Sequence, residues 1–178
     1  MRSVCMTQLK RNIRAGALVG LLVAVVLVAS YALYHREPEI IDPAETVGEP
    51  IALDEAYGYS ELTPPSLACT VRLCGTPEVD GKDVYLYLTS VEYNAYLIRA
   101  EIYDVQMQVN EATGEKKPSP GKLLGQTGFI HPGTYVEKLH LDKGLKNGEN
   151  PVYIKIALRD EESGCSEGFF YLGTTFVK

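Results

Sequence analysis

An uncharged apolar stretch over residues 15–34 constrains this chain more than any other feature of its sequence. At a helical rise of about 1.5 Å per residue these 20 residues would measure roughly 30 Å, the hydrocarbon thickness of a bilayer. We therefore predict a transmembrane helix over residues 15–34. The flank before it is basic and the flank after it is mostly acidic, so the positive-inside rule predicts a cytoplasmic tail over residues 1–14. The expected location is a cell membrane crossed once, with the C-terminal part extracytoplasmic.

A cleaved secretory signal is the alternative interpretation of the same stretch. Ser30-Tyr31-Ala32 has the small-x-small pattern of a cleavage site after a basic N-terminal region. The apolar part of such a signal usually runs about 7 to 15 residues, which is shorter than this stretch and favours a retained anchor. Both interpretations export the same C-terminal domain.

Small residues recur at every fourth position of the predicted span. Gly16, Gly20 and Ala24 would lie on one stripe of the helix, where small side chains let two helix backbones approach closely. The stripe predicts helix packing, with a homodimer through the transmembrane helix as one outcome. The alternative is that glycine and alanine are simply frequent in membrane spans.

Residues 35–65 contain five prolines and eight acidic residues but a single arginine. Such a segment lacks large apolar groups and repels itself, so we expect an acidic extended linker. Two short apolar pieces, residues 40–41 and 51–53, leave open that parts of the linker dock on the folded domain or on a partner. The remaining residues, 66–178, suffice for one extracytoplasmic domain of common size.

Apolar and polar residues alternate through much of this domain. The alternation predicts strands with one buried face over residues 83–89, 95–105 and 152–158. Weaker strand signals cover residues 67–73, 123–130, 135–141 and 168–177. Turn-forming residues separate these segments, and no helical pattern interrupts them. We therefore predict an all-β fold, an immunoglobulin-like antiparallel β-sandwich of about seven strands.

Three segments of the domain carry a resemblance to a known group of proteins. They are VYLYLTSVEYNAYLIRAEIYD, GKLLGQTGFIHPGTYVEKLHLDKGL and NPVYIKIALRD, and the resemblance covers residues 82–172. The chain resembles small single-span extracytoplasmic β-sandwich proteins of Gram-positive-type bacteria. The resemblance implies the fold and a place in the cell envelope, and it implies no catalytic residues.

Sequence motifs for chemistry are missing from the chain. The three histidines, at positions 35, 131 and 140, have no metal-binding spacing, and there is no nucleophile elbow or phosphate-binding glycine loop. We predict no enzyme activity, no cofactor and no metal site. From residue 66 onward there are 12 basic and 15 acidic residues without a basic run, which argues against nucleic acid as a partner.

Three cysteines fall in the predicted extracytoplasmic domain, while Cys5 falls in the tail. The preferred disulfide is Cys74 with Cys165, because each lies next to a predicted turn. Cys69 and Cys74 on one extended strand would lie about 16 Å apart, beyond the limit of about 7 Å between Cα atoms, although a turn between them would permit a bond. The leftover thiol would be buried or would bridge to another chain.

The domain is rich in tyrosine, since the chain has 12 tyrosines, four phenylalanines and no tryptophan. Tyr85, Tyr87 and Tyr153 occupy predicted outward positions of strands, where rings with hydroxyl tips form contact surfaces for proteins or glycans. The alternative is cross-strand packing among these rings and neighbouring lysine stems.

Together these features predict a non-catalytic, membrane-anchored extracytoplasmic interaction or assembly module with a protein partner in the cell envelope. The second hypothesis is a surface domain that binds cell-wall glycan or a small molecule. An enzyme is the third, and it would need convergent titratable side chains in a pocket.

Overall fold

The computed structural model describes residues 41–50, 58–65, 67–111 and 114–178, which belong to one compact unit, Glu39–Lys178. The predicted tail and the predicted span, with Gly16, Gly20 and Ala24, lie outside the described residues. In the part that is described, no helix is long and apolar enough to cross a bilayer.

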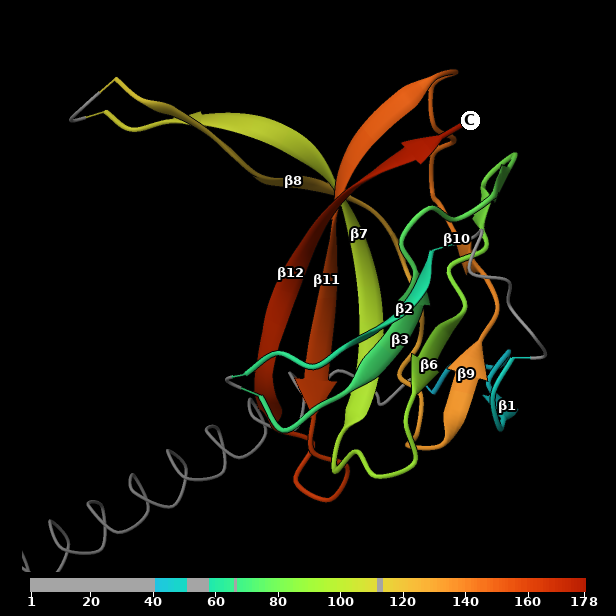
Figure 1. Cartoon of the computed structure of the whole chain (residues 1–178). Coiled ribbons are helices and arrows are strands. Elements are labelled where there is room, and N and C mark those ends of the chain that lie inside the picture. Colours follow the sequence, from blue (N-terminus) through green and yellow to red (C-terminus); the bar gives the residue numbers. More distant parts are fainter. Residues whose placement is uncertain (1–40, 51–57, 66, 112–113) are drawn as a thin grey trace, which may run out of the picture. The chain divides into compact units, whose positions relative to one another are not determined.

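The described residues form antiparallel strands in three sheets (Figure 1). The first sheet, in the order β1-β9-β6-β3-β2, contains β1 (Thr46–Val47), β9 (Thr134–Val136), β6 (Leu88–Ser90), β3 (Val71–Cys74) and β2 (Tyr59–Leu62). A small second sheet contains β10 (Leu139–His140), β5 (Asp83–Val84) and β4 (Val79–Asp80) in that order. The third contains β12 (Ser166–Val177), β11 (Glu149–Arg159), β7 (Leu97–Val109) and β8 (Lys116–Gln126) in that order. This all-β antiparallel architecture confirms the predicted class and is consistent with a β-sandwich.

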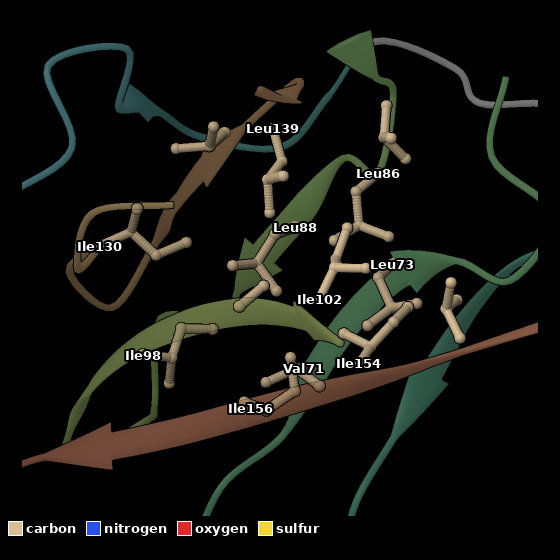
Figure 2. Close-up of a cluster of buried hydrophobic side chains, with 14 of the residues drawn as sticks. Val71, Leu73, Leu86, Leu88, Ile98, Ile102, Ile130, Leu139, Ile154 and Ile156 are labelled. Carbon is tan, nitrogen blue, oxygen red and sulfur yellow. The ribbon is translucent and has the colours of Figure 1, made fainter. Parts of the chain in front are cut away.

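One hydrophobic core joins the third sheet to the other two. Ile102 on β7 and Ile154 on β11 are direct cross-strand partners, and both are buried. They belong to one cluster with Leu73 and Leu88 of the first sheet, which Figure 2 shows between the ribbons of both layers. Burying a side chain of this size stabilises the fold by about 2 kcal/mol.

The predicted strand over residues 83–89 is interrupted in the structure. Val84, Leu86 and Leu88 are all buried, so the predicted alternation is correct as far as Leu88, whereas Thr89, predicted to face outward, is also buried. Tyr87, however, has a φ of 50°, a left-handed conformation that a bulky residue adopts only under constraint. Its N–H donates to the carbonyl oxygen of Glu137 at 2.9 Å, which helps to hold the chain in this bend between β5 and β6.

The structure corrects the predicted boundary between linker and domain. Within residues 35–65, β1 pairs with β9, β2 pairs with β3, and Ile41 forms a bridge with Phe129. The acidic residues that suggested self-repulsion find donors on the domain: a carboxylate oxygen of Asp42, for example, accepts the N–H of Gly128 at 2.7 Å. The described parts of the segment are therefore part of the fold, whereas residues 35–40 and 51–57 lie outside the described ranges.

The β7–β8 hairpin runs past the strand with which β7 pairs in the sheet. The register of β7 with β11 ends at Asp104, while β7 and β8 stay paired to Val109 and Lys116. Figure 1 shows this hairpin projecting from the rest of the sheet. Met107 and Val109 are accordingly exposed, although both are apolar.

A buried amide connects the segment before β3 to the loop after β6. The side chain of Asn94 accepts the N–H of Thr70 at 2.8 Å, and its amide donates to the carbonyl oxygen of Thr70 at 2.7 Å. The same amide nitrogen lies 3.0 Å from the hydroxyl of Ser90. All three residues are buried, so no solvent could replace these bonds.

We expect Asn94→Ala to lower the free energy of unfolding by about 2 to 3 kcal/mol, because it leaves both backbone groups of Thr70 unsatisfied. Urea unfolding of the full-length protein in detergent, followed by circular dichroism, measures the change. Asn147→Ala is the matched control, since Asn147 is exposed in a turn and its removal should leave the midpoint unchanged. Equal unfolding midpoints for the two variants would contradict a stabilising role of the Asn94 hydrogen bonds.

Candidate functional site

Most ring contacts among the described residues lie on the outer face of the β12-β11-β7-β8 sheet. Because side chains alternate along a strand, burial of Ile102 and Ile154 directs Tyr103 and Tyr153 to the opposite face. The outward residues of β12, including Phe169 and Tyr171, complete this surface, which we call the aromatic face.

Tyr171 contacts three other rings of the aromatic face. Its ring centroid lies 5.5 Å from that of Phe169, 6.1 Å from that of Tyr153 and 6.3 Å from that of Tyr103. The interplanar angles are 73° to 75°, the edge-to-face geometry that aromatic pairs prefer. Phe169 is 53% exposed and Tyr171 is 41% exposed, so the cluster offers large rings to solvent.

A buried carboxylate lies beside these rings. Glu101 on β7 is only 3% exposed, and it pairs directly with Lys155 on β11. Its carboxylate accepts hydrogen bonds from Arg99 at 2.6 Å, from the hydroxyl of Tyr103 at 2.6 Å and from Lys155 at 2.9 Å. Three donors around one acid satisfy a charge that would be costly to bury alone.

The cations of this network also contact rings. The ammonium of Lys155 lies 5.1 Å from the ring centre of Phe169, and the guanidinium of Arg99 lies 4.7 Å from that of Phe129. Arg159 approaches the ring of Phe129 from 5.5 Å. The Nε of Arg99 is buried without a hydrogen-bond partner, so the contact with the Phe129 ring adds to the ion pair that the guanidinium forms with Glu101. Ion pairs and rings thus form one continuous, ordered surface.

The network shifts the acidity of its members. Burial by itself raises the pKa of Glu101, but the hydrogen bonds from Tyr103 and Lys155 and the charge of Arg99 outweigh it and lower the pKa overall. The pKa of Tyr103 is raised, first by burial and then by its hydrogen bond to the Glu101 carboxylate. Glu101 is therefore charged, and Tyr103 neutral, at neutral pH.

We expect Glu101→Gln to lower the free energy of unfolding by about 2 kcal/mol at pH 7, because two cations lose their counter-charge. A lowered carboxyl pKa contributes stability above the unfolded value of 4.5 and loses it as pH falls through the folded value. The difference from the wild type should therefore shrink as the pH falls below 4.5. Urea titrations of the full-length protein between pH 3 and 7 measure this, with the exposed Glu167→Gln as control. A difference in unfolding free energy that stays constant between pH 3 and 7 would contradict this expectation.

The predicted tyrosine surface is divided in the structure. Tyr153 belongs to the aromatic face, but Tyr85 and Tyr87 project from the opposite layer, away from the shared core. There the two rings lie 6.5 Å apart, and the ammonium of Lys138 lies 5.9 Å from the centre of the Tyr85 ring while it pairs with Asp83 at 2.6 Å. The sequence patterns did not point to Phe169, Tyr171 or Glu101 as site residues. For Phe169 and Tyr171, the available signal was their outward position on the weakly predicted strand over residues 168–177.

A second polar cluster ties the segment before β1 to the domain. The carboxylate of Glu45 accepts the hydroxyl of Thr134 at 2.6 Å and contacts the ring of His131 at 3.0 Å. Burial raises the pKa of Glu45, yet hydrogen bonds from Thr134 and His131 lower it overall. Thr134 bonds to the acid and not to the imidazole, so the three residues lack the order of a nucleophile, base and acid triad. Nor do any three His, Cys, Asp or Glu side chains of the described residues gather as metal ligands.

A groove of about 450 Å³ opens beside the β7–β8 hairpin. Its wall is formed by Asp104 and Val105 in the middle of β7, by residues 122–124 of β8, by the start of β11 and by the loop from Asp142 to Lys146. Apolar side chains such as Leu123, Leu145 and Val152 alternate with charged ones of both signs. The lining suits an amphipathic ligand.

The predicted disulfide between Cys74 and Cys165 is absent, because both residues are free thiols in the structure, as is Cys69. Cys74 precedes Gly75, whose carbonyl accepts the hydroxyl of Thr174 at 2.8 Å. Thr174 is nine residues from Cys165 on an extended strand, which is roughly 30 Å. Burial raises the pKa of Cys69 and of Cys74 to about 11.

We expect the exposed thiol of Cys165 to react with iodoacetamide in the folded protein, whereas Cys69 and Cys74 react only after denaturation. Peptide mass spectrometry of the full-length protein, labelled before and after urea treatment, separates the three sites. Recovery of a peptide that joins Cys74 to Cys165 without reduction would contradict this expectation.

Comparison with known proteins adds no relative. No family model, no curated protein and no solved structure matches the chain.

Proposed function

We propose that this chain is a membrane-anchored, extracytoplasmic interaction module that binds a protein partner of the cell envelope through the aromatic face of an immunoglobulin-like sandwich. The observation that carries the proposal is the half-exposed pair Phe169 and Tyr171 beside the Glu101 ion network. Rings held in one geometry lose little conformational entropy on binding, and aromatic residues dominate the energetic centres of protein interfaces.

The charges of the aromatic face favour a protein partner. Glu101 is matched by Arg99 and Lys155, so a partner that covers this face meets no uncompensated buried acid. The phenol groups of Tyr153 and Tyr171 supply hydrogen bonds at the rim of the apolar centre, as interface tyrosines commonly do. The uncharged stretch over residues 15–34 supports anchoring of this domain to a membrane.

The groove beside the β7–β8 hairpin supports a second candidate, a domain that binds cell-wall glycan or a small molecule. Its volume of about 450 Å³ is within the range of ligand sites, and its lining combines apolar walls with a few polar groups.

The test is recovery of partners from native membranes after brief crosslinking of the tagged full-length protein. We expect Phe169→Ser with Tyr171→Ser to reduce recovery of a defined membrane partner at least about tenfold, because each ring would be a major contact. Tyr85→Ser is the matched control, since Tyr85 lies on the opposite layer, and it should leave recovery unchanged. A truncated protein without residues 1–34 reports whether the predicted anchor is needed.

Two results would redirect the interpretation. If the double variant recovers the same partner at the wild-type level, the aromatic face is not the contact surface. If neither the full-length nor the truncated protein recovers a partner, while soluble glycan fragments protect Lys122 or Lys143 in the groove from acetylation, the ligand-binding candidate takes precedence.

A further inference from the structure

The four-stranded sheet has two edges, and they are built differently. The edge at β8 is blunted by Pro118 and Pro120, which lack an N–H, and by three exposed lysines. Prolines and lysines on an edge strand prevent another strand from pairing with it. The edge at β12 has no such protection: from Gly168 to Val177 it contains neither a proline nor a charged residue.

Apolar side chains line the unprotected edge. Phe169 is 53%, Tyr171 41% and Val177 64% exposed, and no described residue pairs with the outer side of β12. A long, uncharged and apolar edge with free backbone groups is a template for pairing with another strand. Maintaining such an edge in a protein whose other edge is protected calls for a strand that covers it.

Hydrogen bonding at the end of β12 identifies the free backbone groups. Lys178 and Gly148 exchange both of their hydrogen bonds, at 3.0 and 3.2 Å, so Lys178 faces β11. Residues on an antiparallel strand alternate between facing one neighbour and facing the other. The N–H and C=O groups of the alternate residues therefore point away from β11; these residues are Phe169, Tyr171, Gly173, Thr175 and Val177.

We propose that a second copy of this chain pairs antiparallel along β12, with Gly173 of one copy opposite Gly173 of the other. This register places Tyr171 opposite Thr175 and Phe169 opposite Val177, so all five outward residues enter hydrogen-bonded pairs. Both side-chain pairs combine an aromatic with a β-branched residue, a favourable cross-strand combination. Gly173 has no side chain to collide at the two-fold axis, and the uncharged strand meets no like charge.

A two-fold axis at Gly173 makes the contact closed and self-complementary, which is the commonest symmetry of homo-oligomers. The third sheet would continue through both copies, and the two aromatic faces would lie on the same side of it. The inference is distinct from the partner proposed above because it rests on the backbone groups of the β12 edge, while the rings of Phe169 and Tyr171 belong to both surfaces.

Cysteine crosslinking in native membranes tests the register. In a full-length background with Cys5→Ser and Cys165→Ser, we expect Gly173→Cys to give a covalent dimer on mild oxidation, because opposed Cα atoms in a hydrogen-bonded pair lie about 5.5 Å apart. A side chain at 173 meets only the Tyr153 ring, at 3.5 Å, which is an ordinary contact. Val177→Cys is the control: its two copies would lie about 27 Å apart and should not crosslink. No dimer from Gly173→Cys, or equal dimer yields from both variants, would overturn the proposal.

A second pair of variants separates the β12 contact from any association elsewhere in the chain. Thr175→Pro removes an N–H that points away from β11, so it should spare the fold and raise the dimer dissociation constant about tenfold or more. Thr175→Val keeps the N–H and should dimerise like the wild type. Light scattering of the full-length proteins in detergent gives the mass. A dimer unaffected by Thr175→Pro, or a crosslink from position 173 to a different protein, would assign the edge to something other than a second copy.

Discussion

The antiparallel register between β7 and β11 is the constraint on which the other features depend. It pairs Ile102 with Ile154 and Glu101 with Lys155, so one face of both strands is apolar and the other is ionic and aromatic. A slip of one residue would turn Glu101 into the core and the isoleucines to solvent. The cost of that exchange, a buried charge without donors and several exposed apolar side chains, specifies the register strongly.

The outer face of this sheet combines a dense set of polar and ring contacts with exposure to solvent. Each cation near Glu101 has two kinds of partner, a carboxylate and a ring, and Tyr103 links the acid to the aromatic cluster. Removing one member would leave the others partly unsatisfied, which makes such a network cooperative. The exposed rings of Phe169 and Tyr171 lie beside this network, and for that reason they can present one fixed shape to a partner.

The margins of the domain differ in charge and in the hydrogen bonding of their backbone. Acidic residues of the segment before β2 and on β2 are bound by the domain, as Asp42 is by Gly128 and Glu49 and Glu61 are by Arg72. Prolines and lysines protect β8, whereas β12 is uncharged from Gly168 onward and pairs with no described residue on its outer side. Pairing with a further strand is therefore hindered at the β8 edge of the sheet, and no proline or charged residue hinders it along β12 from Gly168 to Val177.

By itself, the sequence determined the all-β class, the inward positions of the strong strands and the absence of a helical pattern in the domain, because period-two alternation is a local property of the chain. It also indicated the outward position of Tyr153. Only the tertiary structure decided that Glu101 meets Lys155 across 54 residues, that Tyr85 and Tyr153 lie on opposite layers, and that Cys74 lies far from Cys165. These contacts depend on which strands pair and in which register, and composition does not encode them. The acidic segment shows the same limit, since acids that repel one another in an extended chain become stabilising where a fold supplies backbone N–H groups and an arginine.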